Sequence, residues 1–143
     1  MDSPTIIEMK GNHDYFITIT LQSDPFIHSR KADQNTIAAT WFIKAGRFQS
    51  QFEVTFEAYE LVGLLDALQE VYQQVGKETE VQFALEWYLV LTFKLSKIGH
   101  LEVETEAWTS DVRLSSSMQA DQSFLPFWIR EVKNALQRFS LLD

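Results

Sequence analysis

The hydrophobic period of the chain changes from two residues to about 3.6 residues twice, and this order of patterns limits the folds open to the sequence. From Phe48 to Phe56, phenylalanine and valine alternate with glutamine, glutamate and threonine, as in a strand with one buried face. Leucine and valine then follow a helical stripe from Leu61 to Val75, and Gly76 is a suitable C-terminal stop. Strands followed by a helix indicate a sheet that buries one face beneath that helix.

The same order returns in the second half of the chain. Strand-like segments lead to a second helix that Ser123 can cap and whose first turn tolerates Pro126. A long irregular segment, Gln22 to Asn35, is expected to be a surface loop. The expected strands are Tyr15–Leu21, Thr36–Lys44, Phe48–Phe56, Val81–Leu85, Trp87–Leu95, Leu101–Trp108 and Val112–Met118.

These patterns predict one α+β domain over residues 1–143, with a mostly antiparallel sheet of about seven strands and two helices packed on one face. Hydrophobic residues make up 45% of the chain, which is enough for an ordinary core. A two-fold pattern relates residues 15–76 to residues 79–143. It reflects either a duplication or the general tendency of such units to bury their apolar faces alike.

The net charge excludes several classes of partner. The chain carries 20 acidic and 12 basic side chains, for a formal charge of −8, so nucleic acids and anionic membranes would be repelled. It has no cysteine, which suits a reducing compartment, and residues 1–4 do not resemble the start of a secretory signal. We therefore expect a soluble cytoplasmic protein. Its acidic charge either keeps the chain in solution or attracts a basic protein partner.

Motifs for catalysis and for cofactor binding are missing from the sequence. No glycine-rich loop could cradle phosphates, and no serine or cysteine lies in a nucleophile motif. His13, His28 and His100 are far apart and fall in expected loops or turns. We therefore expect that the chain is not an enzyme and that it binds no metal or cofactor.

One enzymatic alternative rests on carboxylates. A hydrolase or metal-binding enzyme would require several of them to converge in a concave site within about 5–10 Å. The candidates for that site are Glu53, Glu86, Glu102 and Glu104.

An acidic ladder with an aromatic residue at its end is the candidate partner-binding site. Glu102, Glu104, Glu106 and Trp108 recur at the two-residue period, on the side of their strand opposite Leu101 and Val103. An exposed aromatic ring beside acidic side chains suits protein recognition. The alternative is a solvated polar face, on which Lys94 from a neighbouring strand offsets part of the repulsion.

The overall pattern resembles the WapI-type bacterial immunity proteins. The resemblance runs from about Tyr15 onward and is carried by the segments 52–56, 60–68, 83–89 and 127–139. It implies a cytoplasmic protein without enzymatic activity that neutralises a toxin domain by direct binding. A homodimeric structural protein, which pairs an exposed sheet edge with its own copy, is a further alternative.

Overall fold

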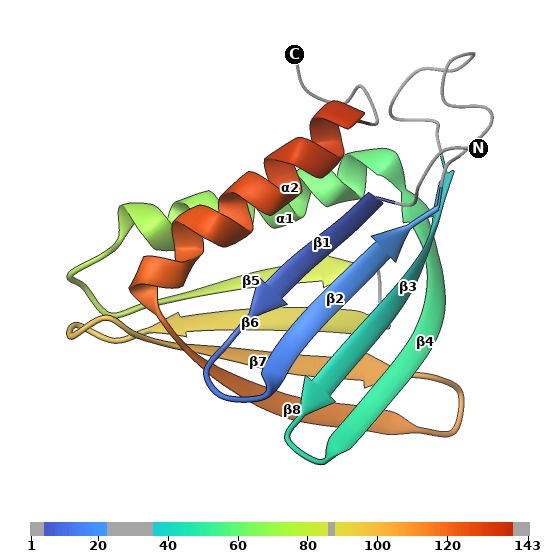
Figure 1. Cartoon of the computed structure of the whole chain (residues 1–143), viewed down its shortest axis with the longest axis horizontal. Helices are drawn as coiled ribbons and strands as arrows, with labels where there is room; N and C mark the ends of the chain where they lie inside the picture. The colour runs from blue at the N-terminus through green and yellow to red at the C-terminus, as the bar shows by residue number, and fades with distance from the viewer. Residues whose placement is uncertain (1–4, 23–35, 86–87, 139–143) are drawn as a thin grey trace.

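Two antiparallel sheets of four strands, each followed by a helix, form the part of the chain that the computed structural model describes, residues 5–22, 36–85 and 88–138. Neighbours in sequence are neighbours in each sheet, in the orders β1-β2-β3-β4 and β5-β6-β7-β8 (Figure 1). The first sheet contains β1 (Thr5–Lys10), β2 (Tyr15–Leu21), β3 (Thr36–Ala45) and β4 (Phe48–Glu57), followed by α1 (Ala58–Gln73). The second contains β5 (Thr79–Leu85), β6 (Leu89–Leu95), β7 (His100–Trp108) and β8 (Arg113–Asp121), followed by the short 3-10 helix η2 (Gln122–Phe124) and α2 (Leu125–Arg138).

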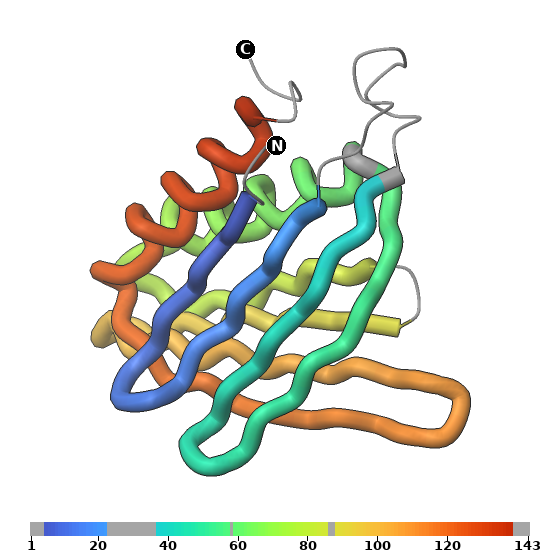
Figure 2. The backbone as a smooth tube through the Cα atoms, turned by 45° about the vertical axis from the view of Figure 1, so that its right-hand side comes forward, coloured from blue at the N-terminus to red at the C-terminus, as the bar shows by residue number. Residues whose placement is uncertain are grey.

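The inner faces of the two sheets share one hydrophobic core. The strands of one sheet cross those of the other in Figure 2. The two helices lie against each other and close one side of the core, where α2 packs against β1 and α1 packs against β5 (Figure 1). The largest side chains that are buried in this core are Trp41, Trp128, Phe93, Ile7, Met9, Ile17, Ile19, Leu21, Ile37, Leu61, Leu64 and Leu68.

The structure confirms the predicted α+β domain and differs slightly in its strand count, and its strands form two sheets where one was expected. The described residues form eight strands, because residues 5–10 form β1, which the sequence analysis did not predict. Its signal was present: Ile7 and Met9 are buried while Glu8 and Lys10 are exposed, as period two requires. The predicted strands and helices otherwise appear with small shifts at their ends. The expected loop lies almost entirely outside the described residues, and so does the start of the predicted strand at Trp87.

The residues that cap the helices differ in part from those that the sequence predicted. Glu57 and Glu60 form a capping box at the start of α1, and Gly76 has a positive φ of 96° after its end. Ser123 does not act as the capping side chain; its backbone N–H donates to the carboxylate of Asp121 at 2.9 Å. Asp121 therefore caps the 3-10 helix η2, and Ser123 lies within η2, before the start of α2.

The turn between β1 and β2 docks on β8 because Gly11 has no side chain. The backbone N–H of Asn12 donates to the carbonyl oxygen of Gln119 at 2.7 Å. A Cβ atom at Gly11 would lie 2.4 Å from Cγ of Met118 and 2.7 Å from the carbonyl oxygen of Gln119. The second of these atoms belongs to the backbone, so relief of the clash would require the turn to move away from β8.

We predict opposite effects for the same substitution at two glycines. Gly11→Ala should lower the free energy of unfolding by about 1–3 kcal/mol, because it overpacks the contact between the turn and β8. Gly63→Ala in α1 should raise that free energy by about 0.5–1 kcal/mol, since alanine favours helix. At Gly63 the new Cβ would meet the ring of Phe83, with Cε1 at 3.6 Å and Cδ1 at 3.8 Å, which are ordinary van der Waals contacts. Urea unfolding of both variants measures the two changes, and a neutral Gly11→Ala would contradict the close approach.

Candidate functional site

The outer face of the second sheet carries the predicted acidic ladder. On β7, Leu101, Val103 and Ala107 are buried in the core, so the alternate residues point away from it. The structure therefore places Glu102, Glu104, Glu106 and Trp108 together on the outer face, each partly exposed. We call these four residues and their cross-strand neighbours Glu80, Lys94, Arg113 and Gln119 the acidic face.

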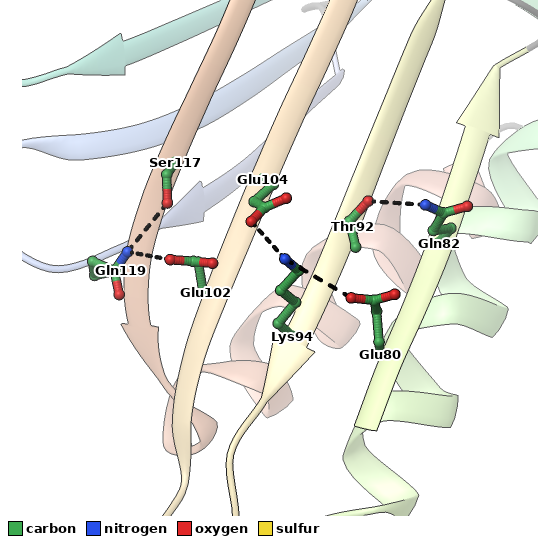
Figure 3. Close-up of polar contacts among 8 residues, drawn as sticks. All are labelled: Glu80, Gln82, Thr92, Lys94, Glu102, Glu104, Ser117 and Gln119. Atoms are coloured by element: carbon green, nitrogen blue, oxygen red, sulfur yellow. Dashed lines mark hydrogen bonds and ion pairs between the residues drawn. The ribbon is translucent and has the colours of Figure 1, made fainter. Parts of the chain in front are cut away.

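Lys94 lies in the middle of the acidic face and contacts carboxylates on both neighbouring strands. Its Nζ donates to Oε1 of Glu104 at 2.8 Å and lies 3.9 Å from Oε1 of Glu80 (Figure 3). The hydrogen bond to Glu104 is the largest cause of a raised pKa at Lys94, so this amine stays protonated at neutral pH. Lys94 thus offsets part of the repulsion among the carboxylates, as the alternative of a solvated polar face expects.

Glu102 is held by hydrogen bonds from β8 rather than by a close ion pair. Nε2 of Gln119 donates to Oε2 of Glu102 at 3.0 Å and to Oγ of Ser117 at 3.2 Å (Figure 3). The amide oxygen of Gln119 in turn contacts Nε2 of His100. The hydrogen bond from Gln119 is the largest cause of a lowered pKa at Glu102.

Trp108 ends the ladder beside a cation. The guanidinium carbon of Arg113 lies 5.6 Å from the centre of the Trp108 ring, and Nη2 of Arg113 lies 2.9 Å from Oε2 of Glu106. Arg113 thus joins the aromatic ring to the last carboxylate of the ladder. Arg113 thus makes a cation–π contact with Trp108 at the end of β7.

The carboxylates proposed for the enzymatic alternative do not converge within the described residues. Glu53 lies on the outer face of the first sheet, whereas Glu102 and Glu104 lie on the outer face of the second. Glu86 lies outside the described residues. No group of three or more histidine, aspartate and glutamate side chains in the described segments is placed to hold a metal ion.

The two described histidines also lie apart. His13 is in the turn between β1 and β2, where it has a positive φ of 59°, and His100 begins β7. His28 lies outside the described residues. His100 contacts Gln119, so its ring belongs to the border of the acidic face.

A groove between β1 and α2 is a feature that the sequence analysis missed. It encloses about 700 Å³, with Phe127 exposed on one rim and Trp128 at its base, where the indole N–H donates to the carbonyl oxygen of Lys10. Its further lining residues are Glu8, Gly11, Phe124, Arg130 and Glu131. The groove depends on the packing of α2 against β1, and since β1 was not predicted, nothing in the predicted elements pointed to it.

No described helix is long and apolar enough to cross a membrane.

Comparison with known proteins identifies a family and a fold. The model of the Immunity protein WapI-like family matches residues 6–140, which is most of the chain. No curated protein sequence matches. Two solved structures share the fold at low sequence identity: the MRP1/MRP2 proteins of Trypanosoma bruciei (TM-score 0.51, 10% identity, covering 98% of this chain and 87% of the other) and a guide-RNA-binding protein complex bound to a guide RNA (TM-score 0.56, 11% identity, covering 97% and 94%).

We predict that Gln119→Leu will raise the pKa of Glu102 toward its ordinary value of 4.5, because the variant lacks the amide donor. In the natural chain, the lowered pKa stabilises the fold above the unfolded value, and this contribution is lost as the pH falls through the folded value. The variant should therefore lose less stability on acidification. Titration of the Glu102 carboxyl carbon by NMR measures the shift.

Gln82→Leu is the matched control for this titration. Gln82 also points outward, and its amide donates to Thr92 at 3.3 Å rather than to Glu102. The pKa of Glu102 should not change in this variant. An unchanged Glu102 pKa in Gln119→Leu would show that the hydrogen bond from Gln119 does not control that carboxylate.

Proposed function

The chain belongs to the Immunity protein WapI-like family, and on that premise we propose that it neutralises a toxin domain by binding it directly through the acidic face. Membership of this family supports a toxin-neutralising binding role. The particular surface is our proposal, with Glu102, Glu104, Glu106 and Trp108 as the contact residues. Binding alone accounts for neutralisation, and no catalytic step is required of this chain.

The observation that carries the proposal is the placement of these four side chains on one regular sheet surface. They project from a single strand with strands paired on both sides of it, so the backbone beneath them is fixed by two ladders of hydrogen bonds. A partner that binds this surface therefore does not have to order its backbone, which favours affinity.

The charge of the acidic face selects a basic partner. Four carboxylates, those of Glu80, Glu102, Glu104 and Glu106, outnumber the two cations Lys94 and Arg113. The excess negative charge would attract a basic protein surface, raise the association rate and fix the orientation of the complex. The same excess would repel a phosphate backbone, so the likeness to the guide-RNA-binding complex supports a shared fold rather than a shared ligand.

Trp108 supplies the apolar contact that a charged surface alone lacks. Tryptophan is among the residues that contribute most to the free energy of protein association, especially where surrounding contacts exclude water. Arg113 stacks on this ring and bonds Glu106, so the aromatic group and the end of the ladder form one continuous contact area. We propose that the toxin domain covers this area and places basic side chains along the ladder.

The experiment is binding of the purified chain to the toxin domain encoded beside it. The double substitution Glu102→Gln with Glu104→Gln should slow association by about tenfold at low salt, with a smaller loss at high salt, because it removes charge while keeping the side-chain shape. Trp108→Ala should weaken binding by about 30-fold, which corresponds to about 2 kcal/mol. Surface plasmon resonance gives both rate constants.

A matched double substitution controls for net charge. Asp66→Asn with Glu70→Gln removes the same two charges from exposed positions of α1. Its association rate should stay within about twofold of the natural chain. If this control weakened binding as much as the double substitution on the acidic face, the binding surface would not be the acidic face. Failure of the natural chain to bind the toxin domain would contradict the proposed function itself.

A further inference from the structure

The edges of the two sheets differ in how their backbone groups are used. At the edge of β1, the N–H of Glu8 donates to the carboxylate of Glu131, and the carbonyl oxygen of Lys10 accepts the Trp128 indole. At the edge of β8, the carbonyl oxygen of Gln119 accepts the Asn12 N–H. Edge strand β5 packs against α1, which has fewer contacts with β4.

The edge of β4 presents backbone groups that no described residue satisfies. Ala45 pairs with Phe48 across a two-residue hairpin turn, so the backbone groups of even-numbered residues of β4 point toward β3. Those of Gln49, Gln51 and Glu53 consequently point outward. The segment has no proline and no bulge, and its one charged side chain is that of Glu53 at its end, so it lacks most of the features that usually protect an edge strand.

The two ends of this edge differ in their surroundings. Beyond Glu53, a backbone group of the edge already has a hydrogen-bond partner, because the hydroxyl of Tyr88 donates to the carbonyl oxygen of Thr55 at 2.6 Å. Phe48, at the other end of the segment, is 81% exposed. The β7–β8 hairpin extends past β4 in both views, and its inward-facing Leu114 is only partly buried (Figures 1 and 2). A strand added to β4 would extend the first sheet over this hairpin.

We propose that two copies of this chain associate through β4, forming an antiparallel β4–β4 pair with Gln51 on the two-fold axis. Each outward N–H of the 49–53 segment then finds a carbonyl oxygen on the second copy. The pair is isologous, as expected for a closed dimer. It lies on the first sheet, whereas the acidic face belongs to the second, so the dimer goes beyond the proposed function and leaves the acidic face open.

The side chains of β4 favour a second copy in this register. With Gln51 facing its own copy, Gln49 lies opposite Glu53 of the second copy, where an amide can donate to a carboxylate. On the inner side of the strand, the exposed Phe48 lies beside Val54 of the second copy. A register centred on Glu53 would instead place the Glu53 carboxylates of the two copies opposite each other. It would also require the carbonyl oxygen of Thr55, which already accepts a hydrogen bond from the hydroxyl of Tyr88.

Sedimentation velocity of the purified chain, without any toxin, tests the dimer. The expected mass at high micromolar concentration is twice 16.6 kDa. Gln51→Pro should return the mass to that of one chain, because it removes an outward N–H while the ladder between β3 and β4 stays intact. Gln82→Lys, on the edge strand β5, is the control and should remain a dimer.

Charged substitutions of Gln51, at the two-fold axis, distinguish a specific loss of the β4–β4 pair from a general loss of folded structure. Gln51→Lys and Gln51→Glu should each sediment as a monomer, because like charges would face each other, and a mixture of the two should sediment as a dimer. The proposal is overturned if the natural chain is a monomer, if Gln51→Pro and Gln51→Lys stay dimeric, or if the mixture does not associate.

Discussion

The rest of the structure depends on the burial of one face of each sheet against the other. Residues alternate strictly along the strands, so every inward side chain that joins the shared core fixes its neighbour on the outer surface. A slip of one residue on β7 would place Glu102 and Glu104 in the core and Leu101 and Val103 in water. The burial of two charged groups would be far more costly than any gain in pairing. The register of the core therefore fixes the position of the acidic face.

The outer faces of the two sheets consequently differ in their side chains. The first sheet exposes a surface in which Phe16 and Phe42 lie 5.7 Å apart with Lys44 over the Phe16 ring. The second exposes the carboxylates and cations of the acidic face. The helices cover neither outer face, because they pack beside β1 and β5. One fold thus presents two chemically different surfaces, and the excess of carboxylates is the feature that suits the role of the immunity family.

Local periodicity predicted most elements and the side to which each residue points. The position of Trp108 with Glu102, Glu104 and Glu106 follows from alternation alone. The division into two sheets did not follow from it, because pairing between distant strands depends on contacts across the core. β1 was missed because the adjacent Ile6 and Ile7 obscure the start of its alternation, and the groove beside α2 was missed with it. The contacts of Gln119 and Arg113 required the register of β7 with β8.

Tryptophan fluorine NMR tests the central claim, that the acidic face is the toxin-binding surface, most directly. The chain has four tryptophans, of which Trp41 and Trp128 are buried and Trp108 lies on the acidic face. When the toxin domain is added to a chain labelled with 5-fluorotryptophan, the resonance of Trp108 should shift while those of Trp41 and Trp128 should stay in place. A shift at Trp128 with none at Trp108 would assign binding to the groove between β1 and α2 and contradict the account.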